Sequence, residues 1–188
     1  VMRILKPMWR EKPETAYRLM GRIERVLSAA KAQGLREGEN PARWRGHLDN
    51  LLPPRVKLSR GHHKALSYED IPEFMKRLRS RCGSATIALE FTILTAVRSG
   101  ETMNATWGEI NFDDSTWVIP AERMKAGIEH RVPLTSRSMT LLEQASELRN
   151  GQLIFPGNKH GSSLSSNSMS AVLKRMQLDC TVHGFRSS

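Results

Sequence analysis

Three short basic segments lie far apart in an otherwise ordinary sequence. Arg98 follows an apolar run, Lys125 lies between two β-prone runs, and His183 and Arg186 stand three residues apart near the end of the chain. Guanidinium and ammonium groups bind phosphate oxygens, and histidine transfers protons near neutral pH. Each also has an ordinary explanation: Arg98 could pair with Glu101, and a loop lysine or a neighbouring histidine and arginine could simply be solvated. Taken singly, none of them identifies a site.

A buried helix is expected immediately before Arg98. Residues 85–96 are apolar nearly all round, which is typical of a central helix covered by its neighbours. The chain should then turn tightly over residues 97–101 and form a second helix that reaches Trp107. Arg98 is therefore predicted to lie in a tight turn beside the core.

Lys125 is predicted to lie in the loop of a small β-ribbon. The runs 116–120 and 131–134 are short and β-prone, and an extended segment joins them. Pro120 and Pro133 have no backbone N–H to donate, so each run is expected to be an edge strand.

An amphipathic helix is expected over residues 15–32. Its apolar residues recur at helical spacing, and Gly34 is a plausible C-terminal cap. Arg18, Arg22 and Arg25 give this helix a basic side.

Further helices are expected after Ser67 and toward the end of the chain. Ser67 with Asp70 three residues later approximates a capping box. Apolar periodicity predicts two more helices, around residues 139–148 and 169–176.

Charge and composition divide the chain. The net charge is +10, and residues 1–66 carry 15 basic and 6 acidic residues against a net charge of +1 over the rest. Residues 53–66 combine a proline pair, a glycine and basic residues without periodicity, as an exposed linker does. We expect a helical domain over 1–52, a basic linker over 53–66 and a second domain over 67–188. The charge favours a polyanionic partner, although basic helices can also serve solubility alone.

Cysteine usage and hydropathy argue against several classes of protein. Cys82 and Cys180 are far apart and have no ligand partner at metal spacing, so we expect neither a disulfide framework nor a metal site. The longest apolar stretch, residues 85–97, is too short to span a bilayer and contains Glu90. We therefore expect a protein of the reducing cytoplasm with no membrane partner.

Taken together, the basic segments resemble successive motifs of the tyrosine recombinases, the phage integrase family. They occur in the family's order and at compatible separations: Thr95–Glu101, Met124–Lys125, His130–Leu134 and Thr181–Arg186. Upstream, residues 12–16 and 40–44 resemble the DNA-clasping domain of P4-like prophage integrases. The resemblance covers nearly the whole chain. It implies a mainly α fold with a small antiparallel β-ribbon (α+β), in which a helical core-binding domain precedes a catalytic domain.

The resemblance assigns a role to each residue of the basic segments. Arg98 and Arg186 would be the two active-site arginines, Lys125 the hairpin lysine, His183 the histidine of the His-x-x-Arg motif, and Glu101 the acid that supports Arg98. Phosphodiester transfer suits this set, because two guanidiniums can bind the charge that develops on the non-bridging oxygens. A lysine of lowered pKa can protonate the leaving 5′ oxygen. Since side chains supply the cations, no metal and no cofactor are expected.

The activity that the resemblance implies is site-specific DNA recombination. Such an enzyme breaks and rejoins DNA through a 3′-phosphotyrosine intermediate, and so integrates or excises a mobile element. The expected partner is double-stranded DNA at attachment sites, clasped by the two domains and bound by a homotetramer of the intact enzyme at the bacterial nucleoid. The side chains expected to contact DNA are Arg18, Arg22, Arg25, Lys57, Arg60, His62 and Lys64.

Some features depart from the family's pattern. The two tyrosines, Tyr17 and Tyr68, both precede the arginines, and the sequence ends at Ser188, before the place of the family's nucleophile. The arm-binding domain of related integrases is not present at the start, and Ser99 stands where proline is common. We therefore expect a fragment that binds DNA without cleaving it. Two alternatives remain: a non-catalytic DNA-binding or regulatory module, and a type IB topoisomerase-like protein.

Overall fold

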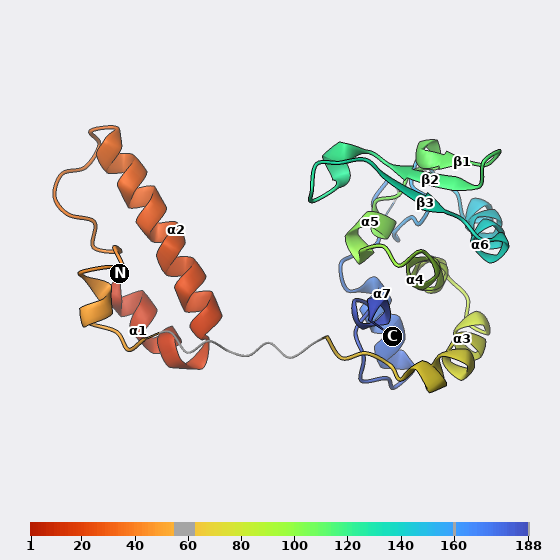
Figure 1. The fold of residues 1–188 in the computed structure, drawn as a ribbon, viewed down its shortest axis with the longest axis horizontal. Helices are drawn as coiled ribbons and strands as arrows, with labels where there is room; N and C mark the ends of the chain where they lie inside the picture. Colours follow the sequence, from red (N-terminus) through yellow and green to blue (C-terminus); the bar gives the residue numbers. More distant parts are fainter. Residues whose placement is uncertain (55–62, 160, 188) are drawn as a thin grey trace. The chain divides into compact units, whose positions relative to one another are not determined.

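The chain forms two compact units in the computed structural model (Figure 1). The structure describes residues 1–54, 63–159 and 161–187, and the units are Val1–Gly61 and His62–Ser188. The boundary falls inside the segment predicted to be a linker. The exact linker bounds stay a prediction, because residues 55–62 lie outside the described part. No helix in the described ranges has the length and hydropathy needed to cross a membrane.

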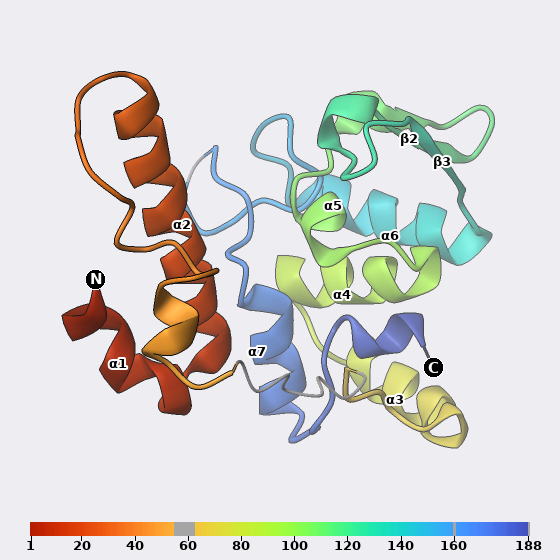
Figure 2. The ribbon, with the colours of Figure 1, turned by 60° about the vertical axis from the view of Figure 1, so that its left-hand side comes forward.

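The first unit is built on two consecutive helices. These are α1 (Met2–Glu11) and α2 (Pro13–Ala32), and the segment after α2 returns along it to a 3₁₀ turn at Leu48–Asn50 (Figure 2). Pro13 starts α2 at a position where no N–H is needed, two residues before the predicted start. Gly34 follows the helix with φ +71°, and the N–H of Leu35 bonds the carbonyl of Ala30, as in the expected glycine cap.

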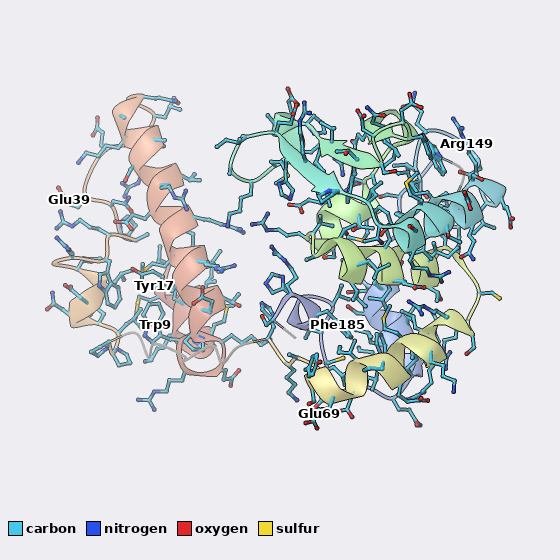
Figure 3. All side chains as sticks on the ribbon, turned by 45° about the vertical axis from the view of Figure 1, so that its right-hand side comes forward. Trp9, Tyr17, Glu39, Glu69, Arg149 and Phe185 are labelled. Atoms are coloured by element: carbon cyan, nitrogen blue, oxygen red, sulfur yellow. The ribbon has the colours of Figure 1, made fainter. Side chains whose placement is uncertain are left out.

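Helix α1 was not predicted, yet it supplies much of the first core. Leu5 and Trp9 lie one turn apart on α1 and are buried, and Trp9 stacks on Trp44 with ring centroids 5.4 Å apart (Figure 3). The Trp9 indole N–H donates to the carbonyl of Pro53 at 2.9 Å. Ala16 of α2 closes the same core.

Over its described residues, the second unit packs five α-helices with a three-stranded antiparallel sheet of order β1-β2-β3. The helices are α3 (Ile71–Arg79), α4 (Ser84–Thr95), α5 (Ser99–Met103), α6 (Ser136–Glu147) and α7 (Ser168–Arg175). The strands are β1 (Ile110–Asn111), β2 (Thr116–Ile119) and β3 (His130–Pro133). This is the expected mainly α fold with a small sheet.

Helix α4 is the centre of the second unit, as its sequence predicts. Helices α3, α5, α6 and α7 all contact it (Figures 1 and 2). Leu89 and Phe91 are fully buried, and the Phe91 ring lies 5.4 Å from those of Trp117 and Phe155. Neighbours on every side explain why this helix is apolar nearly all round.

The sheet differs from the predicted ribbon in one respect. Strand β2 pairs with β3 in the register Trp117↔Val132, but it also pairs with the two-residue strand β1 on its other side. The prediction that the run ending at Pro120 is an edge strand is therefore wrong, because β2 lies between β1 and β3. Pro120 does not prevent this pairing, since it lies just beyond the end of β2. The prediction for Pro133 is confirmed, since β3 is an edge.

Two helix boundaries were predicted incorrectly. The Ser67 side chain caps no helix: a 3₁₀ turn over Tyr68–Asp70 follows it, and α3 begins at Ile71. Helix α5 begins at Ser99 and ends at Met103, whereas Trp107 starts a separate 3₁₀ turn and bonds the carbonyl of Gln152 at 3.0 Å. Both errors come from reading short turns as parts of longer helices.

Candidate active site

Arg98 lies in the short connection between α4 and α5 and is the N-cap residue of α5. Ala96 adopts the left-handed conformation, with φ 52°, and ends α4, after which Arg98 is extended. The Arg98 backbone N–H donates to one carboxylate oxygen of Glu101 at 2.8 Å, and its guanidinium donates to the other at 2.8 Å. The Glu101 side chain is 8% exposed, whereas that of Arg98 is 47% exposed. One buried carboxylate thus fixes the helix start and aims the guanidinium outward.

Lys125 follows a 3₁₀ turn, Ala121–Arg123, at the start of the loop between β2 and β3. Its side chain is exposed, and no residue in the described ranges pairs with its ammonium group. The neighbouring Arg123 is anchored: its guanidinium donates to the Glu109 carboxylate and, at 2.5 Å, to the carbonyl of Glu101. Neither Arg123 nor Glu109 was predicted to belong to the site, since contacts between distant residues leave no local pattern in the sequence.

His183 precedes a 3₁₀ turn, Gly184–Arg186, that ends at Arg186 and whose Phe185 side chain enters the core. Phe185, labelled in Figure 3, stacks on Phe74 with centroids 4.9 Å apart, while His183 and Arg186 are exposed. The Arg186 Nε donates to the carbonyl of Ala96 at 2.8 Å. Because Ala96 is two residues from Arg98, this bond brings the second arginine to the neighbourhood of the first.

His63 also reaches this region, although it was not among the residues predicted to be catalytic. Its ring lies edge-on to His183 with centroids 4.4 Å apart. The next residue, Lys64, accepts a hydrogen bond from the backbone N–H of Thr181 at 2.9 Å, which holds the segment in place. A Cβ atom at Gly184 would lie 2.2 Å from the Lys64 carbonyl oxygen, so glycine permits this close approach.

Three of the four predicted catalytic side chains line one open cleft of about 610 Å³. Arg98 and Lys125 give the cleft its cationic side, next to His183. The full lining is Arg98, Ser99, Gly100, Glu101, Glu122, Arg123, Met124, Lys125 and His183. Partial desolvation, followed by the nearby His63, Arg186 and Arg98, lowers the pKa of His183. The lowered pKa favours the neutral form of His183, in a cleft suited to an anion.

The arginines expected to contact DNA form one stripe on α2. Arg18, Arg22 and Arg25 lie at i, i+4 and i+7 and are exposed, opposite the buried Ala16 and Met20. Arg18 pairs with Glu14 at 2.9 Å, and the Nε of Arg25 donates to the carbonyl of Gly21 at 3.2 Å.

The remaining residues expected to contact DNA lie near the predicted linker. Lys64 is exposed and pairs with Asp179 at 2.5 Å. Lys57, Arg60 and His62 lie outside the described residues.

Solved structures of two integrase assemblies share the fold of this chain. A lambda integrase tetramer bound to a Holliday junction matches with a TM-score of 0.65 and 18% identity, over 97% of this chain and 55% of that one. A lambda integrase (residues 75–356) dimer bound to a COC′ core site matches with a TM-score of 0.66 and 19% identity, over 97% of this chain and 68% of the other. At these identities the likeness establishes the tyrosine recombinase fold.

Sequence comparison then gives the family. The model described as phage integrase central domain matches residues 1–47, and that of the phage integrase family matches residues 64–188. The integrase of Enterobacteria phage P4 is 32% identical over 94% of this chain and 43% of its own length. Prophage integrase IntZ of Escherichia coli (strain K12) is 33% identical over 100% of this chain and 46% of its own length. The chain belongs to the phage integrase family and spans less than half the length of these relatives.

Proposed function

We propose that the chain is the DNA-clasping part and the cationic half of the active site of a site-specific recombinase that integrates or excises a mobile element. The observation that carries this proposal is the cleft lined by Arg98, Lys125 and His183, with Arg186 bonded beside it. These four residues come from three separate stretches of the chain. A shared cleft of cations is what a phosphodiester requires when charge builds on its non-bridging oxygens.

The proposed reaction follows from the chemistry of these groups. A tyrosine oxygen of the intact enzyme attacks the phosphorus, and neutral His183 accepts the proton that the phenol loses. The bond from phosphorus to the 5′ oxygen breaks, and that oxygen takes a proton from Lys125. Arg98 and Arg186 hold the non-bridging oxygens throughout. The 3′-phosphotyrosine keeps the bond energy, so the reverse steps rejoin the DNA without ATP.

We propose that neither tyrosine of this chain is that nucleophile. The Tyr17 ring packs edge-on against Trp44, with centroids 6.4 Å apart, in the first unit. Tyr68 is 81% exposed in a 3₁₀ turn and does not line the cleft. We propose that these 188 residues bind DNA without cleaving it.

Double-stranded DNA at attachment sites is the proposed partner. The exposed arginines of α2 and the basic composition of the first 66 residues suit a phosphate backbone. The lambda integrase that shares this fold was solved as a tetramer on a Holliday junction. By analogy, we propose that the intact enzyme acts as a homotetramer on paired sites at the bacterial nucleoid.

Strand-cleavage assays with the intact integrase test this proposal. We expect Arg98→Ala and Arg186→Ala to bind attachment-site DNA and to cleave a suicide substrate about 10²- to 10³-fold more slowly, because each removes a donor to the oxyanion. Arg131→Ala is the matched control, since its side chain is 73% exposed and pairs with Glu129 outside the cleft. Normal cleavage by the first two variants would contradict the assigned roles. A covalent adduct formed by the 188-residue chain itself would contradict the proposal that it lacks the nucleophile.

A further inference from the structure

Lys125 begins a loop that has few contacts with the rest of the protein. Residues 125–129 of this loop are all exposed, including Ile128 at 70%, and β3 begins at His130. By contrast, the preceding Met124 is half-buried and packs against the core of the second unit. The backbone at Lys125 is therefore held to the rest of the second unit through residues 121–124.

Arg123 is the side chain that joins the start of the Lys125 loop to two other elements. One nitrogen of its guanidinium donates to the Glu109 carboxylate, and the other donates to the carbonyl of Glu101 in α5 at 2.5 Å. Glu109 in turn accepts from the indole N–H of Trp117 at 2.9 Å, and Trp117 of β2 is fully buried. The Arg123 and Glu109 side chains are 21% and 9% exposed. The guanidinium thus ties the loop both to the sheet and to α5.

Both sides of the cleft are held through the same residue, Glu101. Its carboxylate holds the Arg98 guanidinium, and its carbonyl accepts from Arg123. Lys125 is two residues beyond Arg123, and two residues span at most about 7 Å. We propose that Arg123 is a positioning residue for strand cleavage, which fixes the Lys125 loop relative to Arg98 so that both cations face one phosphate. The inference rests on the function proposed above, in which Lys125 protonates the leaving oxygen.

Arg123→Lys separates this role from a purely structural ion pair. A lysine at position 123 can keep an ion pair with Glu109, but its single ammonium group lacks the planar fork that also reaches the Glu101 carbonyl. Arg131→Lys is the matched control, because it makes the same substitution on the same hairpin at an exposed side chain paired with Glu129.

The leaving group provides a readout that a structural role would not change. Suicide substrates are prepared with either oxygen or sulfur bridging the phosphorus and the 5′ carbon. In both, the tyrosine oxygen bonds to phosphorus, and the bond to the 5′ oxygen or the 5′ sulfur breaks. The oxygen must take a proton from Lys125, whereas sulfur leaves as the thiolate, because the pKa of a thiol is only about 8.5. A defect that acts through Lys125 is therefore rescued by sulfur.

The assay uses the intact integrase that contains this chain. We expect Arg123→Lys to cleave the oxygen substrate about a hundredfold more slowly and the sulfur substrate within about threefold of the parent, as Lys125→Ala also should. Arg131→Lys should match the parent on both substrates, and Arg98→Ala should be slow on both. The inference is overturned if Arg123→Lys loses the same activity on both substrates or loses none. The proposed function still stands in that case, provided that Lys125→Ala shows the defect on the oxygen substrate alone. If Lys125→Ala shows no such defect, the proposed function fails, and the inference fails with it.

Discussion

Glu101 shows how one residue can organise a site through its side chain and its backbone carbonyl. Its carboxylate accepts from the Arg98 backbone and guanidinium, and its carbonyl accepts from Arg123. Arg98 forms the ion pair with Glu101 that would be its ordinary structural explanation. The family resemblance assigns the same contact to Glu101 as the acid that supports Arg98. A pair with a buried carboxylate and a half-exposed arginine leaves the remaining guanidinium N–H groups available to a ligand.

His183 predicts a pH dependence of DNA binding. Partial desolvation and the charges of His63, Arg186 and Arg98 lower its pKa in the free protein, and a bound phosphate would raise it again. Binding of DNA then takes up a proton at His183. The affinity for DNA should therefore rise as the pH falls from about 7.5 through about 6.5, the ordinary pKa of histidine, toward the lower pKa of His183 in the free protein. Fluorescence anisotropy with the 188-residue chain checks this. His183→Asn should give a flatter profile, and identical profiles for the two proteins would contradict the prediction.

At the scale of elements, Glu90 joins three helices of the second unit. It is buried in α4 and accepts hydrogen bonds from Arg79 of α3 at 2.8 Å and from Arg137 of α6 at 2.9 Å. Burial alone would raise the pKa of Glu90, but the hydrogen bonds and charges of Arg137 and Arg79 outweigh it and lower that pKa. The charge that interrupts the apolar run of α4 is thus a structural link.

Glu90→Gln should destabilise the chain in a pH-dependent way. We expect the free energy of unfolding to fall by about 1–2 kcal/mol at pH 7. The loss is smaller than for a fully buried ion pair, because both arginines are partly exposed to solvent. The folded pKa of Glu90 is lowered, so its contribution is present above the unfolded pKa of about 4.3 and is lost as the pH falls through the folded value. Urea denaturation from pH 7 to pH 3 should show the free energies of unfolding of the parent and the variant converging as the pH falls below about 4.3. Glu143→Gln, at an exposed position on α6, is the control, and a constant difference would argue against the link.

Two glycines should respond oppositely to alanine. At Gly184 a Cβ atom would lie 2.2 Å from the Lys64 carbonyl oxygen, whereas at Gly21 nothing lies within 4 Å. Gly184→Ala should therefore cost about 1–3 kcal/mol, because backbone has to move. Gly21→Ala in the middle of α2 should stabilise the chain by about 0.5–1 kcal/mol. Thermal or urea unfolding measures both, and a neutral Gly184→Ala would show that the segment at Lys64 is not held closely.

For the whole molecule, charge separates the two units. Residues 1–61 hold 14 basic and 6 acidic residues, a net charge of +8, whereas residues 62–188 hold 15 and 13, a net charge of +2. Arg18, Arg22 and Arg25 place part of that charge on one exposed face of α2. The first unit is therefore expected to supply much of the non-specific affinity for DNA.

The salt dependence of DNA binding tests this division of charge. Replacing Arg18, Arg22 and Arg25 together with alanine should reduce the slope of log affinity against log salt by about 2–3, since each phosphate contact contributes about 0.9. The control is Lys31→Ala with Arg43→Ala, whose side chains both pair with Glu39. An unchanged slope in the triple variant would remove the α2 stripe from the DNA interface.

Patterns within single elements were predictable because they arise from neighbours in the sequence. The burial of α4, the β2–β3 pairing, the basic face of α2 and the cap at Gly34 follow from local periodicity and turn chemistry. Helix α1 and strand β1 were missed. Strand β1 has two residues, and α1 is stabilised by the stacking of Trp9 on Trp44, a contact between residues far apart in the chain.

The sequence by itself determined the kinds of groups present: two arginines, a lysine and a histidine within recognisable motifs, on a mainly helical chain with a basic first part. The tertiary structure alone decided that Arg98, Lys125 and His183 share a cleft and that Arg123 and His63 border it. The physical reason is that side-chain type and local periodicity are properties of short stretches of chain. Hydrogen bonds such as Arg123 to Glu101 and Arg186 to Ala96 depend instead on how distant elements pack around α4.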